Sequence, residues 1–141
     1  GCGSNSTAKT VESIKEAKNL GADAALVVFP YYNKPNQEGF YRHFTEIADN
    51  TDLPLIIYNI PGRTGKNIVA STILEMAKHP LIVAVKEASG DLAQMMEIIS
   101  SAPKDFELLS GDDNLTLPIP NDLFRQFAAE IAEHYGENAE P

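Results

Sequence analysis

Residues 81–91 read Leu81-Ile82-Val83-Ala84-Val85-Lys86-Glu87-Ala88-Ser89-Gly90-Asp91, an apolar run that ends on an ammonium group. A short apolar run bounded by turn residues is typical of a strand in a parallel sheet, buried on both faces. Burying an unpaired charge is costly, and a buried lysine commonly responds by losing its proton. A neutral lysine at the carboxyl end of a strand is a nucleophile suited to Schiff-base chemistry. The alternative interpretation is that Lys86 marks the point where the strand reaches solvent.

A second buried strand is expected upstream. The sequence there is Leu55-Ile56-Ile57-Tyr58-Asn59-Ile60-Pro61-Gly62-Arg63-Thr64-Gly65, which ends in a phenol and, after a turn, a guanidinium. Further strands are expected over residues 24–29 and 106–109, and helices over residues 7–20, 37–50, 70–78 and 92–100. This alternation predicts an α/β fold in which helices connect the strands of a parallel sheet.

Candidate site residues follow from this arrangement. In a parallel barrel, the carboxyl ends of the strands and the loops beyond them form the active site. Tyr32 follows the first predicted strand, and Tyr58 and Lys86 stand at the ends of the next two. The pair Gly111 and Asp112 follows the fourth. We therefore expect these residues to meet on one rim.

Five segments of the chain resemble, in order and spacing, the dihydrodipicolinate synthase (4-hydroxy-tetrahydrodipicolinate synthase) family of pyruvate-dependent class I aldolases. They are Gly1-Cys2-Gly3-Ser4-Asn5-Ser6-Thr7, Pro30-Tyr31-Tyr32-Asn33-Lys34-Pro35 with Gln37-Glu38-Gly39, Tyr58-Asn59-Ile60-Pro61-Gly62-Arg63-Thr64-Gly65, Lys86-Glu87-Ala88-Ser89-Gly90-Asp91 and Ser110-Gly111-Asp112-Asp113. The resemblance covers residues 1–118, with Cys2 where the family pattern leads us to expect Thr.

The size of the chain bears on the fold that this resemblance implies. A complete (β/α)₈ TIM barrel usually needs about 250 residues, and this chain has 141. We therefore expect a truncated, partial TIM barrel, about strands three to seven, over residues 1–118. Its unpaired edges and uncovered face favour association, so we expect completion by strand or helix swapping or by assembly into a homodimer or higher homo-oligomer. Residues 119–141 resemble nothing in the family and are expected to form a helix over 121–135 that covers the sheet or binds a partner, then a frayed acidic end.

The resemblance implies a Schiff-base lyase that condenses pyruvate with aspartate semialdehyde in lysine (diaminopimelate) biosynthesis. It implies that Lys86 forms the imine and that Tyr58 shuttles protons. It also implies that Tyr32 reaches into a neighbouring subunit's site, and that no cofactor is needed. The family's relay threonine belongs to a second strand that has no match in this sequence, so we expect impaired activity.

Three further assignments come from the same resemblance. Arg63 is expected to bind the carboxylate of the aldehyde substrate, because a planar guanidinium can donate two parallel hydrogen bonds to that group. Gly111 and Asp112 are expected to offer backbone contacts to the substrate. Asn5 and Tyr31 match positions of an allosteric lysine pocket. Lys9, however, stands where lysine-sensitive members carry a glutamate, so we expect no inhibition by lysine.

Two alternatives to this function remain open. One is N-acetylneuraminate lyase or a keto-deoxy-sugar-acid aldolase, although Gly62-Arg63-Thr64 favours the synthase. The other is a catalytically inactive, structural half-barrel.

The composition of the chain indicates which classes of binding partner and which cellular compartment to expect. The formal charge of −9, from 20 acidic and 11 basic residues, argues against nucleic acid and anionic membranes as partners. No run approaches the roughly 18 apolar residues of a membrane span, and no signal peptide opens the chain. The single cysteine forms no internal disulfide, so the cytoplasm is expected. His43, His79 and His134 lie far apart in sequence, and no metal site is expected.

Overall fold

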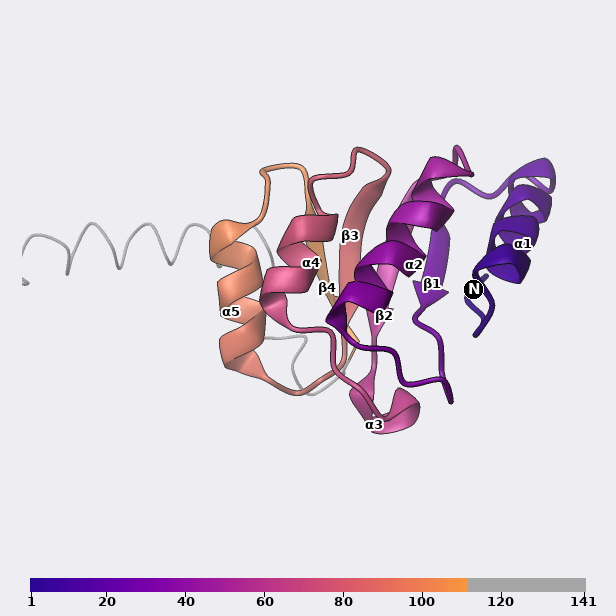
Figure 1. Ribbon diagram of the computed structural model, residues 1–141. Helices are drawn as coiled ribbons and strands as arrows, with labels where there is room; N and C mark the ends of the chain where they lie inside the picture. Colours follow the sequence, from indigo (N-terminus) through magenta and orange to yellow (C-terminus); the bar gives the residue numbers. More distant parts are fainter. Residues whose placement is uncertain (112–141) are drawn as a thin grey trace, which may run out of the picture.

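In the computed structural model, residues 1–111 are described. Within them four strands form one parallel sheet in the order β1-β2-β3-β4 (Figure 1). The strands are β1 (Ala25–Val28), β2 (Leu55–Asn59), β3 (Ile82–Glu87) and β4 (Glu107–Ser110). The predicted alternation of strands and helices in a parallel sheet is therefore confirmed for this part of the chain. Asp112 and the helix expected over residues 121–135 lie outside the described residues.

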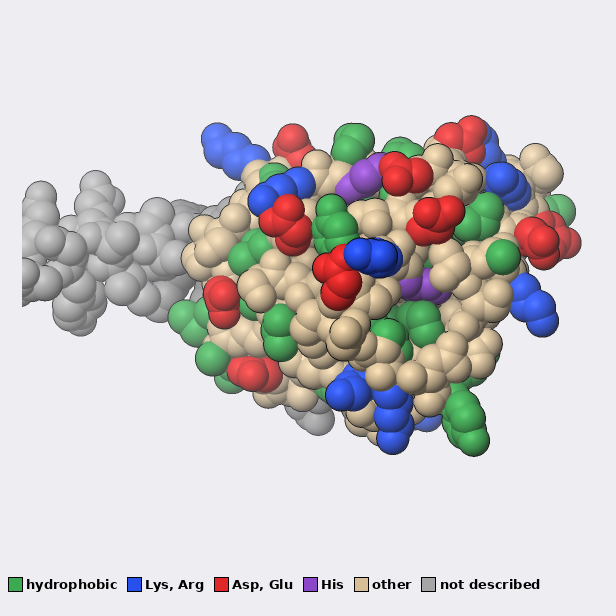
Figure 2. Space-filling model, in the orientation of Figure 1, with side chains coloured by type: hydrophobic (Ala, Val, Ile, Leu, Met, Phe, Trp, Pro, Cys, Tyr) green, Lys and Arg blue, Asp and Glu red, His purple; other side chains and the backbone are tan. Residues whose placement is uncertain are grey.

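Five helices connect and flank these strands. They are α1 (Thr7–Asn19), α2 (Gln37–Asp49), α3 (Pro61–Thr64), α4 (Ala70–Met76) and α5 (Leu92–Ser101). Figure 1 shows α2 and α4 lying across the sheet on the same side, with α5 next to α4 and α1 on the far side of α2. This face of the molecule carries interspersed acidic and basic side chains, as Figure 2 shows, which suits a face in contact with solvent.

Polar side chains fix where three of the helices begin. Ser6, Asn36 and Asp91 stand at the N-caps of α1, α2 and α5, and each accepts a hydrogen bond from a backbone N–H in the first turn. Such a bond satisfies one of the backbone donors that a helix start leaves unpaired.

The short helix α3 stands where the sequence predicts a turn. Pro61 occupies its first position, where the missing N–H costs nothing. Gly65 ends it with φ 76°, and its N–H donates to the Pro61 carbonyl oxygen at 2.8 Å.

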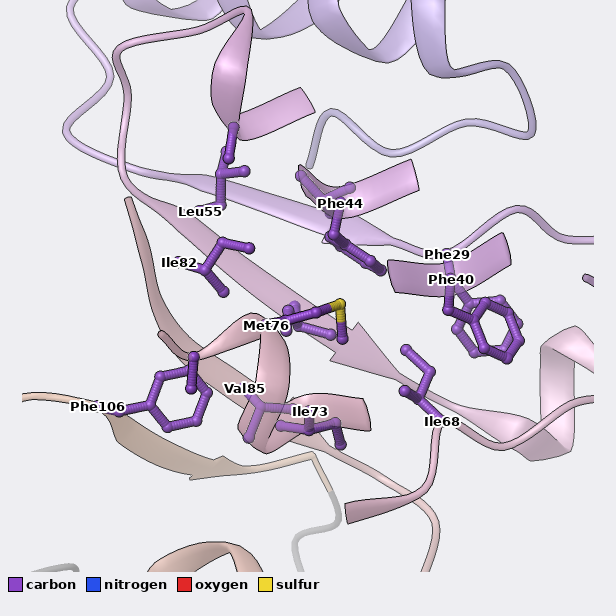
Figure 3. Close-up of a cluster of buried hydrophobic side chains, with 14 of the residues drawn as sticks. Phe29, Phe40, Phe44, Leu55, Ile68, Ile73, Met76, Ile82, Val85 and Phe106 are labelled. Carbon is purple, nitrogen blue, oxygen red and sulfur yellow. The ribbon is translucent and has the colours of Figure 1, made fainter. Parts of the chain in front are cut away.

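The main hydrophobic core lies between the sheet and the helices (Figure 3). The strands contribute Val27, Leu55, Ile57, Ile82 and Val85 to it, and all five are buried. The helices contribute the buried residues Phe40, Phe44, Ile73 and Met76, among others. Alternate strand residues point away from this core, because successive side chains of a strand face opposite sides of the sheet.

The opposite face of the sheet is less covered. Its residues Leu26, Val28, Ile56, Tyr58 and Lys86 are half-buried. The continuous apolar runs predict burial on both faces, whereas the described residues cover only one of them with helices. The structure thus supports an α/β, partial TIM-barrel-like segment.

A register shift in β3 decides which residues share that open face. Leu55 pairs with Ile82, but the next residue, Ile56, pairs with Ala84. The extra residue turns Val85 into the core and places Ala84 and Lys86 on the open face.

Candidate active site

Tyr58 and Lys86 lie side by side on the open face. They pair across β2 and β3, near the carboxyl ends of both strands. The Lys86 Nζ lies 4.8 Å from the centroid of the Tyr58 ring, within the range of a cation–π contact. Both side chains are half-buried. The structure therefore brings a primary amine and a phenol together at the rim where the sequence predicted them.

A pocket of about 420 Å³ lies beside the ends of β1 and β2, and of the two residues Tyr58 lines it and Lys86 does not. Its lining consists of Gly1, Gly3, Leu26, Val28, Tyr31, Tyr58, Ile60, Arg63 and Thr64. The pocket therefore has largely apolar walls, a phenol from the sheet and the guanidinium of Arg63 in its lining. A small organic anion fits this chemistry, because apolar walls exclude water and a guanidinium binds carboxylates.

The N-terminal segment forms one wall by packing on β1. The Cys2 N–H donates to the Leu26 carbonyl oxygen at 2.9 Å. A Cβ added at Gly3 would lie 2.5 Å from the Val28 backbone nitrogen, so only glycine allows this approach.

Helix α3 positions Arg63. Within it, the Thr64 hydroxyl donates to the Ile60 carbonyl oxygen at 2.8 Å, and Thr64 is buried. The α3 turn is anchored by this residue, and the neighbouring Arg63 is left exposed. The guanidinium is consequently free to meet an incoming carboxylate.

Tyr31 and Tyr32 belong to the turn after β1, and the structure separates them. Tyr31 lines the pocket, whereas Tyr32 is 89% exposed. Tyr32 also adopts φ 69°, a backbone conformation that costs a non-glycine residue about 1–2 kcal/mol. The Asn33 side chain donates to the Asn5 carbonyl oxygen at 3.0 Å, which ties the turn to the N-terminal segment.

Gly111 closes the rim beyond β4. Its N–H donates to the Glu87 carbonyl oxygen at 2.7 Å. A Cβ at this position would lie 2.7 Å from the Ala88 Cβ, so the close approach of the two strand ends requires glycine. Its predicted companion Asp112 lies outside the described residues.

Asn5 and Tyr31, the allosteric candidates, face different pockets. Asn5 lines a second pocket of about 350 Å³ together with Asn33, Arg42 and His43, among others. His43 is buried, and its Nδ1 lies 2.8 Å from the Thr7 hydroxyl oxygen. Burial lowers the pKa of His43 to about 4. The neutral His43 thus bridges α1 and α2, a role that its isolated position in the sequence did not indicate.

A group of polar residues that the sequence motifs did not predict as functional lies behind the Tyr58–Lys86 pair. Asn59, Glu87 and Gln94 are buried, and with the half-buried Asn67 they form a cluster on the helix side of the sheet, the buried polar cluster. A signal was present, since Asn59 and Glu87 each follow a site residue in a buried strand, and alternation turns them to the opposite face.

The described residues contain neither a membrane-spanning helix nor a metal-binding group. Among residues 1–111, no helix has the length and apolar character needed to cross a bilayer. The same residues hold no group of three or more His, Cys, Asp or Glu side chains arranged to bind a metal ion.

Known proteins resemble this chain closely. The model of the dihydrodipicolinate synthetase family matches residues 1–121. The 4-hydroxy-tetrahydrodipicolinate synthase of Syntrophotalea carbinolica is 55% identical over 119 residues, which are 84% of this chain and 41% of that protein. The Listeria welshimeri enzyme of the same name is 57% identical over 120 residues, covering 84% of this chain and 41% of its own length.

Solved structures agree with these relatives. The Cyanidioschyzon merolae enzyme, crystallised with lysine bound, has a TM-score of 0.81 at 52% identity, over 84% of this chain and 40% of that one. Dihydrodipicolinate synthase from Aquifex aeolicus has a TM-score of 0.81 at 47% identity, over 84% of this chain and 41% of that one. This chain thus spans about two-fifths of the length of its relatives. With the family model, the relatives and the fold in agreement, the chain belongs to the dihydrodipicolinate synthetase family.

Proposed function

We propose that Lys86 forms an imine with pyruvate, and that this chain supplies the pyruvate-binding part of a 4-hydroxy-tetrahydrodipicolinate synthase. The observation that carries the proposal is the contact between the Lys86 side-chain nitrogen and the ring of Tyr58, which itself lines a pocket together with Arg63. Membership of the family supports it. The setting is lysine (diaminopimelate) biosynthesis in the cytoplasm, with no cofactor.

The proposed chemistry begins at the neutral amine of Lys86. Its nitrogen attacks the keto carbon of pyruvate, and the former carbonyl oxygen takes up protons and leaves as water. The resulting protonated imine withdraws electrons, so the pyruvate methyl group loses a proton and an enamine forms. The enamine carbon then attacks the aldehyde of aspartate semialdehyde, and cyclisation of the adduct returns Lys86 as an amine.

Tyr58 and Arg63 have separate roles in this scheme. The Tyr58 hydroxyl passes protons to and from the reacting oxygen, a contribution typically worth about 10²–10⁴-fold in rate. Arg63 binds the carboxylate of aspartate semialdehyde through its planar fork. In the same scheme Gly111 and Asp112 offer backbone contacts to the substrate. The guanidinium of Arg63 in the pocket lining favours this substrate over the sugar acids of related aldolases.

We further propose that Tyr32 acts in the site of a second copy of the chain. Its ring is 89% exposed on a strained backbone. Such strain persists where it serves a function, and here that function would be to project the phenol beyond the chain's own surface. A homodimer or higher homo-oligomer would also cover the half-buried face of the sheet. Sedimentation of a monomer at micromolar concentration would contradict this assembly.

The imine can be tested by mass spectrometry of the intact chain after incubation with pyruvate and borohydride. We expect one reduced pyruvate adduct, lost in Lys86→Ala and retained in Lys66→Ala, a matched control that removes an exposed lysine near the pocket. A coupled assay with aspartate semialdehyde then tests the complete condensation. An adduct that persists in Lys86→Ala would refute the assignment of Lys86.

A second candidate function is a catalytically inactive structural half-barrel. The observation that favours it is the half-exposed state of Lys86 on the open face, because water stabilises the ammonium form over the nucleophilic amine. Absence of any adduct in the folded wild-type chain would support this second candidate.

A further inference from the structure

The buried polar cluster lies directly behind the Tyr58–Lys86 pair. Its centre is Glu87, which is fully buried, as is Asn59. The Asn59 Nδ2 donates to the Glu87 Oε1 at 3.1 Å and Oε2 at 2.9 Å. The Gln94 Nε2 donates to Oε2 at 3.0 Å, and the Ser89 N–H donates to Oε1 at 2.8 Å. Both carboxylate oxygens are thus held by donors from three other residues.

The cluster extends to Asn67 and joins four parts of the fold. The Asn67 Nδ2 donates to the Gln94 Oε1 at 2.8 Å, and the Asn67 Oδ1 lies 2.7 Å from the Asn59 Nδ2. The Ile68 N–H donates to the Asn59 Oδ1 at 3.2 Å. These contacts connect β2, β3, the segment before α4, and α5. The carboxylate is therefore held by the sheet and by the helix layer together.

A gain in folding stability does not explain why the buried polar cluster is present. None of the ion pairs among the described residues involves Glu87, so its carboxylate is buried against neutral donors. Burying a carboxylate is expensive, and well-packed apolar residues often stabilise a core as well or better. A polar cluster retained at this depth therefore indicates a need for specific geometry.

The geometry that it controls is the register of β2 and β3. Asn59 pairs with Glu87, and the preceding residues, Tyr58 and Lys86, pair with each other. A slip of one residue moves side chains to the opposite face, and would turn Lys86 toward the core. These strands already shift register at their other end, between Leu55 and Ile56, so the apolar pattern alone does not hold them in one alignment.

We propose that Glu87 and Asn59 are positioning residues that hold Tyr58 against Lys86 by fixing β2 to β3 from the opposite face of the sheet. The meaning of this geometry for catalysis rests on the proposed function, but the geometry itself does not. The test therefore needs one readout of imine formation and one that is independent of pyruvate.

The main variant is Glu87→Gln, which keeps the shape but replaces one acceptor oxygen with an NH₂ group that faces the amide donors. A milder variant, Gln94→Met, leaves Glu87 unchanged and keeps an unbranched side chain of similar size. It removes the amide that donates to Glu87 and to the Ile68 carbonyl oxygen and that accepts from Asn67. The matched control is Ile98→Val, a fully buried change in α5 that exchanges one apolar core side chain for another. Urea unfolding measures the stability of all three variants.

The pyruvate-independent readout is the NMR chemical shift of the Lys86 ε-methylene group. In the wild-type chain the ring current of Tyr58 should displace the chemical shift of this methylene group. The Tyr58→Leu variant, which lacks the ring, gives the chemical shift without that displacement. We expect the displacement to be largely lost in Glu87→Gln, reduced in Gln94→Met and retained in Ile98→Val.

The second readout is the rate of borohydride-trapped adduct formation against pyruvate concentration. We expect the maximal rate to fall roughly tenfold or more in Glu87→Gln, since small misplacements of reacting groups are costly, with a nearly unchanged half-saturating concentration. A wild-type chain that forms no adduct would refute the proposed function, while the NMR displacement would still test the positioning. A folded Gln94→Met or Glu87→Gln chain with wild-type displacement and wild-type maximal rate would overturn the inference, as would an equal loss in Ile98→Val.

Discussion

His43 makes the stability of this chain depend on pH in a direction that the structure defines. Burial lowers its pKa from 6.5 to about 4, so the folded chain holds the imidazole neutral while the unfolded chain protonates it. Between these two pKa values the unfolded state binds more protons, and the free energy of unfolding must fall as the pH falls. The stabilisation is complete above about pH 6.5 and is lost toward pH 4.

The magnitude follows from the difference between the two pKa values. At about 1.36 kcal/mol per pKa unit, the full effect is about 3 kcal/mol, of which about 1.4 kcal/mol is lost by pH 5.5. Working at pH 5.5 and above also keeps the chain away from its isoelectric point near 4.7, where its solubility is lowest.

The assay is urea unfolding at pH 7.5 and pH 5.5 for the wild type and for His43→Leu. Leucine removes the titrating ring and the 2.8 Å contact with the Thr7 hydroxyl, and it retains an apolar side chain in the core. The variant should be less stable at pH 7.5, but its stability should change less between the two pH values. An equal loss in both proteins would refute the reasoning, because the pH dependence would then come from other groups.

Three further predictions concern stability. Gly111→Ala should lower the free energy of unfolding by about 1–3 kcal/mol, because its Cβ would lie 2.7 Å from the Ala88 Cβ. Gly62→Ala, where nothing lies within 4 Å, is the control, and equal unfolding curves for the two variants would contradict the steric argument. Tyr32→Gly should relieve the strain of φ 69° and stabilise the isolated chain by up to about 1 kcal/mol, while sedimentation should show weaker self-association; a destabilised variant would mean that the exposed ring packs within its own chain. Asp91→Ala should cost about 1 kcal/mol in urea unfolding through loss of the α5 N-cap, and an unchanged midpoint would show that the cap is dispensable.

Much of the local structure could be predicted from the sequence. The apolar runs ending at Tyr58 and Lys86 predicted strands that the structure confirms. The periodic apolar residues of α2 and α5 predicted helices with nearly the observed bounds. These patterns succeed because a strand repeats every two residues and a helix every 3.6, so each pattern is visible within one short segment.

The arrangement of the candidate site could be predicted only in part. Parallel topology placed Tyr58, Lys86 and Gly111 on one rim, because strand ends meet at the same edge of a parallel sheet. The short helix α3 that presents Arg63 was missed, since Pro61 and Gly62 also suit an ordinary turn.

By itself, the sequence determined the order of strands and helices among residues 1–111, the motifs that place the chain in its family, and the position of Tyr58 and Lys86 near the carboxyl ends of neighbouring parallel strands. Only the tertiary structure decided that Val85 faces the core, that Asn59 and Glu87 bond behind Tyr58 and Lys86, and that one face of the sheet stays half-exposed. The physical reason is the range of the interactions. Periodicity is local, whereas strand register, burial and hydrogen bonding between strands depend on residues far apart in the chain.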